Sequence, residues 1–112
     1  MQRVCVTDTG VEVHHQEPPL VSMYGKQMRP ARAWIAAAPW DEISAISIGV
    51  LSLPPDGERR ISLEIDLIWG EYLEVGQNAE GFAEAVARIA ARAGAAPPDL
   101  STLDGVVTLW GP

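Results

Sequence analysis

The chain has 112 residues, of which 47% are hydrophobic and 21% are charged, and its formal net charge at pH 7 is −7. These values predict a single globular domain that buries about two thirds of its unfolded surface. Residues 1–60 hold seven acidic and six Lys or Arg residues, a balance of −1, whereas residues 61–112 hold eight acidic residues and two arginines, a balance of −6. The acidic second half would repel nucleic acid and anionic membrane surfaces and attract a basic protein, so we expect neither nucleic-acid nor membrane binding.

Cysteine use and hydropathy bear on where the protein works. Cys5 is the single cysteine, which excludes an intrachain disulfide and fits a reducing compartment. Its apolar neighbours Val4 and Val6 predict a buried, inert thiol. The chain lacks a run of about 18 apolar residues and an N-terminal signal peptide, so we expect a cytoplasmic protein.

The N-terminus has the pattern of a β-hairpin. Arg3–Thr7 predicts one strand, Asp8-Thr9-Gly10 a turn, and Val11–His15 the returning strand.

The next segment is less regular. Glu17-Pro18-Pro19 interrupts the pattern. Residues 20–32 predict an exposed loop or a short irregular strand, and they contain three of the eight basic residues: Lys26, Arg29 and Arg32. Ala33–Ala38 predicts a strand that ends before Pro39.

The middle of the chain predicts an antiparallel meander over residues 43–75. Ile43–Leu53 carries large aliphatic residues at period two, and its other face is mostly small: Ala45, Ser47, Gly49 and Leu51. Residues 54–57 (Pro-Pro-Asp-Gly) predict a turn. Ile61–Trp69 and Tyr72–Val75 predict the second and third strands.

One helix is expected, over Asn78–Ala93, with Asn78 as its N-cap. Its apolar stripe consists of Phe82, Val86, Ile89 and Ala93. Glu84 and Arg88 have the spacing of an i,i+4 ion pair, and Gly94 suits the position after the helix.

A last strand is expected over Val106–Trp110, after a link that is rich in Ala and Pro. The fold class predicted from these elements is α+β. We expect a bent antiparallel sheet, or a partly open barrel, of about six to seven strands packed by the helix over 78–93.

An acidic strand is the strongest indication of function. Six acidic residues and no basic one lie between Ile61 and Glu84: Glu64, Asp66, Glu71, Glu74, Glu80 and Glu84. Glu64 and Asp66 fall in an alternating run, so both should point to the same solvent face.

Three interpretations of this strand remain open: a solvated sheet face, a docking face for a cationic protein, or a site for a hard cation. Ile68 and Tyr72 interrupt the polar face, as apolar anchors do in many interfaces. No calcium-type loop accompanies the carboxylates. The candidate partner-binding residues are Glu64, Asp66, Ile68, Glu71, Tyr72 and Glu74.

Catalytic and cofactor signatures are absent from the sequence. His14 and His15 are neighbours on a strand, so they should point to opposite faces and cannot chelate one ion together. No zinc-finger spacing, nucleophile motif or phosphate-binding loop is present. We therefore expect no catalytic residue, metal or cofactor.

Three of the four tryptophans have an expected role. The inward register of Trp69 predicts a core residue. Trp40 is expected to pack against the helix or the barrel end, and Trp110 is a candidate interface anchor.

The order of elements over residues 40–94 resembles the pleckstrin-homology-like fold of small bacterial domains. The likeness depends on Trp40-Asp41-Glu42-Ile43 leading into a strand, on the meander to Val75, and on the helix that follows. The resemblance implies a partly closed antiparallel barrel with one end plugged by the helix. The chain departs from it by continuing past the helix into a strand. The lipid-binding members' basic loop has no clear counterpart apart from Lys26, Arg29 and Arg32, so lipid binding is not implied.

These observations favour a non-enzymatic, acidic protein-binding module. More narrowly, we expect an inhibitor or immunity protein that neutralises a cationic toxin or nuclease. One alternative is a structural or self-assembling domain that uses the C-terminal strand and Trp110, for which a homodimer is the simplest form. Another is a small-molecule-binding or enzyme domain that uses the barrel interior, with His14 or His15 as acid/base.

Overall fold

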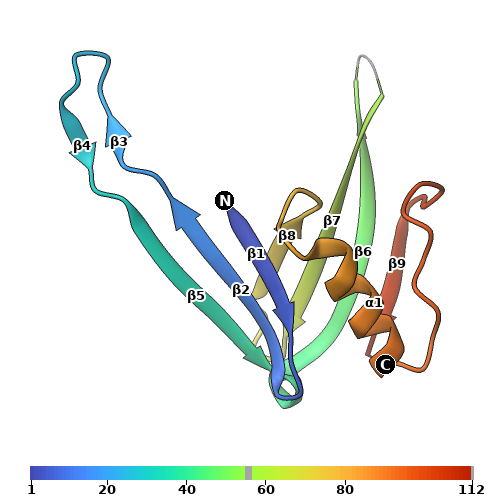
Figure 1. Cartoon of the computed structure of the whole chain (residues 1–112). Helices are drawn as coiled ribbons and strands as arrows, with labels where there is room; N and C mark the ends of the chain where they lie inside the picture. The colour runs from blue at the N-terminus through green and yellow to red at the C-terminus, as the bar shows by residue number, and fades with distance from the viewer. Residues whose placement is uncertain (55–56, 112) are drawn as a thin grey trace.

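The computed structural model describes residues 1–54 and 57–111. Within these residues the fold is mostly antiparallel β, with nine strands in three sheets and one α-helix (Figure 1). The elements in chain order are β1 (Gln2–Val6), β2 (Gly10–Glu17), β3 (Leu20–Val21), β4 (Gln27–Arg29), β5 (Arg32–Pro39), the 3-10 turn η1 (Trp40–Glu42), β6 (Ile43–Leu53), β7 (Glu58–Leu67), β8 (Tyr72–Gly76), α1 (Phe82–Arg92) and β9 (Val106–Trp110). The sheets have the strand orders β1-β2-β5, β3-β4 and β8-β7-β6-β9.

The first sheet confirms the predicted hairpin. β1 and β2 pair antiparallel from Gln2↔His15 to Val6↔Val11, and β5 adds to the other edge of β2. Gly10 is required where β2 begins, because a Cβ there would lie 2.1 Å from the carbonyl oxygen of Ala38.

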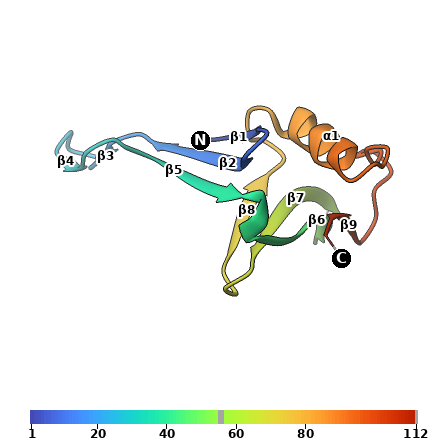
Figure 2. The same cartoon turned by 90° about the horizontal axis from the view of Figure 1, so that it is seen from below.

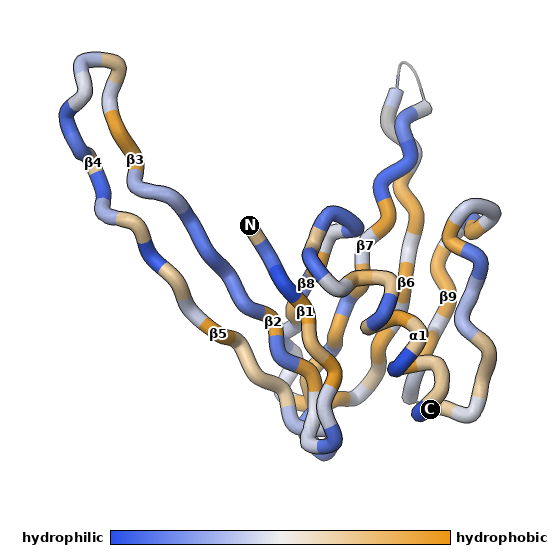
Figure 3. Tube along the Cα trace, in the orientation of Figure 1, coloured by the Kyte–Doolittle hydropathy of each residue, from blue (hydrophilic) through white to orange (hydrophobic). Residues whose placement is uncertain are grey.

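The β2–β5 pair runs outward from the core as an arm that ends in the small β3-β4 sheet (Figure 1). The arm contributes to an elongated shape of 53 × 38 × 25 Å and a radius of gyration of 16.0 Å, against about 13–14 Å expected for a compact domain of this size. Glu17 accepts a hydrogen bond from Arg32 (2.7 Å) and forms an ion pair with Arg29 (3.1 Å). Figure 3 shows an apolar segment at β3, far from the core, where Leu20 and Val21 are exposed.

The second large sheet confirms the predicted meander and the C-terminal strand. β6 pairs with β7, β7 with β8, and β9 with the other edge of β6, all antiparallel. The turn predicted at 54–57 includes residues 55 and 56, which lie outside the described residues. β7 ends at Leu67, two residues earlier than predicted, so the prediction of Trp69 as a core residue is wrong: its side chain lies in the following turn and is 54% exposed.

The described residues form no closed barrel, and their nine strands lie in three sheets rather than in one bent sheet or partly open barrel of six to seven strands. Closure would need one ladder between β1 and β8 and another between the opposite edges, β5 and β9. Instead, the Gln2 side-chain amide occupies the place of the first ladder, donating to the Glu74 carbonyl and accepting from the Gly76 N–H, both at 3.2 Å. The outer edge of β1 bonds instead to Glu80, whose N–H donates to the Gln2 carbonyl and whose carbonyl accepts from Val4 N–H.

The helix begins at Phe82, four residues later than predicted, and Asn78 does not cap it. The bonds that Glu80 makes to β1 keep the preceding residues out of the helix. Gly81 is the N-cap, with a φ of +80° that favours glycine, and a Cβ there would lie 2.8 Å from the Val4 carbonyl oxygen.

The rest of the helix largely follows the prediction. Glu84 and Arg88 form the expected i,i+4 ion pair at 3.0 Å, and Gly94 adopts φ +75° after the last turn. The buried positions are Phe82, Ala85, Val86, Ile89 and Ala90. Ala93, assigned to the stripe, is exposed, because the helix has ended before it.

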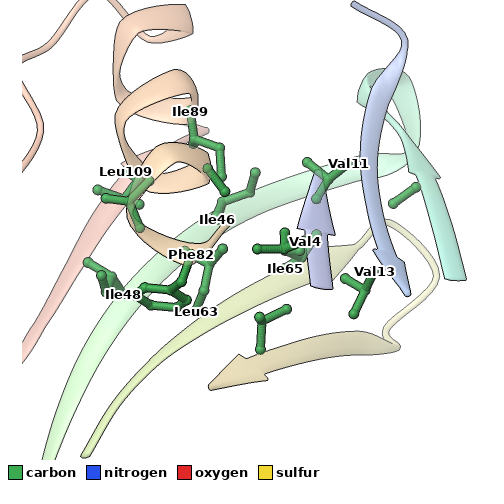
Figure 4. Packing of buried hydrophobic residues seen from close by; sticks show 14 of the residues in the cluster. Val4, Val11, Val13, Ile46, Ile48, Leu63, Ile65, Phe82, Ile89 and Leu109 are labelled. Carbon is green, nitrogen blue, oxygen red and sulfur yellow. The ribbon is translucent and has the colours of Figure 1, made fainter. Parts of the chain in front are cut away.

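The core lies where the two large sheets and α1 meet (Figures 2 and 4). Its fully buried members include Val11 and Val13 from the first sheet, Ile46 and Ile65 from the second, and Ile89 from the helix. Each such side chain contributes about 1.5–3 kcal/mol by leaving water. This packing holds the two large sheets and the helix together, with α1 beside the first sheet and over the second (Figures 2 and 4).

The remaining aromatic and thiol predictions have mixed outcomes. Trp40 is buried, and the Arg92 guanidinium of α1 lies 4.2 Å above its ring, as expected for packing against the helix. Trp110 is half-buried, with its ring 5.3 Å from that of Trp40. Cys5 is half-buried rather than buried, because it points away from the core between Val4 and Val6. No helix in the described part of the chain is long and apolar enough to cross a membrane.

Candidate functional site: an acidic sheet face

The acidic residues of β7 and β8 gather on the outer face of the second sheet. The register places Glu64 opposite Glu74 and Asp66 opposite Tyr72, and directly opposed residues project to the same side of a sheet. The residues between them, Leu63, Ile65 and Val75, point into the core. The prediction that Glu64 and Asp66 share one solvent face is therefore confirmed. We call Glu64, Asp66, Tyr72 and Glu74 the acidic face.

The two other predicted partner-binding residues, Ile68 and Glu71, lie in the turn that follows β7. The Leu67 N–H donates to the Glu71 carbonyl (2.8 Å), and the Ile68 N–H donates to the Glu42 carbonyl (2.9 Å), which ties the turn to η1. Ile68 and Trp69 are 63% and 54% exposed. We call these two residues the apolar tip.

The apolar tip adjoins the acidic face through Tyr72, which is 59% exposed. Sequence reasoning missed Trp69 as a member of this surface. Gly70 was the available signal: its φ of +94° marks the tight turn that takes Trp69 out of the strand register.

The neighbouring strand leaves the carboxylates uncovered. Ala45 lies opposite Asp66 and Ser47 opposite Glu64, so small β6 side chains flank the acidic face. A hollow of about 680 Å³ lies at its other end, lined in part by Glu74, Arg60 and Gln77. The surface therefore has carboxylates in its middle, exposed apolar groups at one end and a polar hollow at the other.

The N-terminal strand positions one of the acidic residues. The Gln2 amide bonds to the backbone on both sides of Val75, at Glu74 and Gly76. This contact covers the free edge of β8 and fixes the backbone that carries Glu74.

The carboxylates of this face repel one another. The pKa of Glu64 is raised above 4.5, chiefly because a proton on it is shared in a hydrogen bond with Asp66, then through desolvation and the negative charges of Asp66 and Glu74. Within the described residues, none of the ion pairs involves Glu64, Asp66, Glu71 or Glu74. A cation placed here would relieve the repulsion.

The histidines lie elsewhere, on β2, and point to opposite faces as predicted. His14 Nε2 lies 3.7 Å from a Glu12 carboxylate oxygen, whereas His15 stacks on Trp34 with the ring centroids 4.9 Å apart. In residues 1–54 and 57–111, no three His, Cys, Asp or Glu side chains come together as a metal site.

Comparison with known proteins yields no relative: no family model, no curated protein and no solved structure matches this chain. The fold and the site alone define it as a small, mostly antiparallel domain, with one α-helix in residues 1–54 and 57–111 and an exposed acidic sheet face.

Proposed function

We propose that the protein is a non-enzymatic binding module whose acidic face docks a basic protein. The observation that carries this proposal is a set of carboxylates that form no ion pair within the described residues and that raise the pKa of Glu64. Exposed aromatic and aliphatic groups lie beside them. Carboxylates without a counter-charge steer a cationic partner toward the face, which increases the rate of association.

The apolar tip supplies the anchors that charge alone lacks. Binding energy at protein interfaces concentrates in a few large groups that become fully desolvated, with Trp and Tyr among the commonest. Trp69 lies in the turn after β7 and the neighbouring Tyr72 begins β8, and the strand behind them is held by the core. A partner with an apolar pocket bordered by Lys or Arg would bury these rings and neutralise Glu64 and Asp66 together.

The narrower proposal is an inhibitor or immunity protein that neutralises a cationic toxin or nuclease in the cytoplasm. The support for it is the net charge of −7, the small size, and a binding surface on rigid strands that needs little ordering on association. An unpaired Cys5 suits a reducing compartment. The pleckstrin-homology-like resemblance stays a prediction and carries no part of this proposal.

The test is affinity capture from a bacterial lysate at about 50 mM and about 500 mM salt, which span weak and strong screening of exposed charges. The double variant Glu64→Lys/Asp66→Lys is compared with wild type and with Asp8→Lys/Asp104→Lys, a remote exposed pair with the same change in net charge. We expect wild type and the remote variant to retain one basic protein at low salt, and the acidic-face variant to lose it. Equal retention by all three proteins would contradict the proposal.

A further inference from the structure

Three edge strands of the two large sheets, β1, β5 and β8, differ in whether their outer edge forms hydrogen bonds. The outer edge of β1 is bonded to Glu80, and that of β8 is bonded to the Gln2 side chain. β5 is also an edge strand, eight residues long, and among the described strands it pairs with β2 alone. Natural sheets usually cover or charge such an edge, because its free N–H and C=O groups can pair with another strand.

The hydrogen-bonding pattern identifies which residues of β5 face outward. Trp40 N–H donates to the Thr9 carbonyl, and the β2–β5 register continues from there without a shift. Because antiparallel residues alternate between bonded and non-bonded pairs, every second residue turns its N–H and C=O away from β2. These residues are Ala33, Ile35 and Ala37, which we call the open edge of β5.

The same alternation predicts which residues of β1 face outward, and the observed hydrogen bonds agree with that prediction. This agreement supports the assignment of the outward residues of β5. Thr7 N–H donates to the Gly10 carbonyl, so Val4 and Gln2 should face away from β2, and these are the two residues that bond to Glu80. No hydrogen bond within the described residues reaches the open edge of β5. Figure 1 shows β5 at the outer margin of the molecule.

We propose that the open edge of β5 pairs antiparallel with the same edge of a second copy of this chain. The two three-stranded sheets would join into one continuous sheet across a two-fold axis near Ile35. Pairing each copy's 33–37 segment with its mate forms about six backbone hydrogen bonds. This inference is independent of the proposed function, since it uses neither the acidic face nor the apolar tip.

The side chains of β5 favour a second copy as the occupant. No charged residue lies between Ala33 and Trp40, so nothing on the strand repels its own copy. With the axis at Ile35, Asp41 of each copy lies opposite position 29 of the other, so it approaches the end that carries Arg29 and Arg32, whose two charges exceed that of their partner Glu17. Ile35, 59% exposed, would meet its own counterpart at the axis.

Proline substitutions can weaken the pairing between two copies without removing the hydrogen bonds that hold β5 in the fold. Ile35→Pro and Ala37→Pro each remove an outward N–H while leaving the bonds to β2, and edge strands tolerate such a proline. Ile35→Ala is the matched control, because it removes the side chain and keeps the N–H. The measurement is sedimentation equilibrium from about 1 μM to about 1 mM, which covers the dissociation constants of most weak dimers.

We expect a dimer for wild type, a dissociation constant increased more than tenfold by either proline, and a smaller increase for Ile35→Ala. Glu64→Lys/Asp66→Lys should leave the dimer intact. A monomer at every concentration would overturn the proposal, and so would a dimer insensitive to both prolines, which would place self-association at β9 or at the arm tip.

Amide hydrogen exchange of the wild type tests the pairing of β5 with a second copy even if the proline variants fail to fold. The Ile35 and Ala37 N–H groups should exchange slowly at high concentration and rapidly on dilution. The Ala36 N–H, which faces β2, should stay protected at both concentrations. Rapid exchange of Ile35 and Ala37 at all concentrations would overturn the proposal.

Discussion

Glu64→Gln should stabilise the protein at neutral pH. The substitution keeps the shape of the side chain and a donor for Asp66, but removes one charge from a strand position opposite Glu74. At a separation of about 6 Å, two exposed charges repel by about 0.7 kcal/mol in water, and physiological salt roughly halves this value. With two acidic neighbours, the expected gain in the free energy of unfolding is about 0.6 kcal/mol, or a rise in Tm of roughly 2–4 °C.

The gain should depend on pH in a defined direction. Because the pKa of Glu64 is raised in the folded state, the stability it contributes is fully present below its unfolded value near 4.5 and is lost as pH rises through the folded pKa. The Gln variant does not suffer this loss, so its advantage should appear at pH 7 and vanish near pH 3.5.

The assay is urea unfolding of both proteins at pH 3.5 and pH 7, in low and moderate salt. Moderate salt should reduce the advantage at pH 7. A variant that is no more stable than wild type at pH 7, or that is equally stabilised at pH 3.5, would refute the assignment of mutual repulsion to this face.

Three further predictions concern the fold. Ile65→Ala, at a fully buried position behind the acidic face, should lower the free energy of unfolding by about 2–5 kcal/mol in urea unfolding; a loss below 1 kcal/mol would contradict the packing described. Gly81→Ala should lower Tm more than Gly25→Ala, because both have positive φ but only a Cβ at 81 meets a backbone carbonyl, whereas that at 25 meets nothing within 4 Å; equal losses would argue against that contact. Glu17→Gln should speed amide exchange in the arm, since Arg32 loses its carboxylate partner. The hydrogen bond from Arg32 lowers the pKa of Glu17, so the wild-type arm should loosen only as pH falls below 4.5, and exchange that is insensitive to pH would count against this ion pair.

The strands could be predicted because their local pattern and their final environment agree. Ile46 and Ile48 alternate with small residues, and each reaches the core as the period-two pattern indicates. The C-terminal strand over Val106–Trp110 lies between Gly105 and Gly111, and both glycines adopt positive φ. The acidic face followed for the same reason, since alternation fixes which side of a strand its carboxylates take.

The errors arose where a distant segment overrode the local pattern. Asn78 is a good N-cap residue, but the bonds between Glu80 and β1, some 75 positions earlier in the chain, delay the helix to Phe82. A bent sheet or a partly open barrel was expected from the order of the elements, whereas the described strands form three separate sheets. The Gln2 side chain bonds to the edge of β8 where a ladder to β1 would run, and a local sequence pattern holds no information about such a contact.

The sequence did not predict the arm, because residues 20–32 have no consistent hydrophobic period and allowed either an exposed loop or a short irregular strand. Its position depends on β2 and β5 remaining paired as far as Glu17↔Arg32. The open edge of β5 follows from this pairing, so it could be recognised only once the strand order was known.

The most direct test of the central claim is the affinity of the captured basic protein for this chain, measured as a function of salt concentration. For wild type, we expect the affinity to fall steadily as salt rises, because the acidic face contributes through charge. Glu64→Lys/Asp66→Lys should bind more than tenfold more weakly at low salt and show a flatter salt dependence, whereas Asp8→Lys/Asp104→Lys should follow wild type. An acidic-face variant with the affinity and salt dependence of wild type would contradict the account.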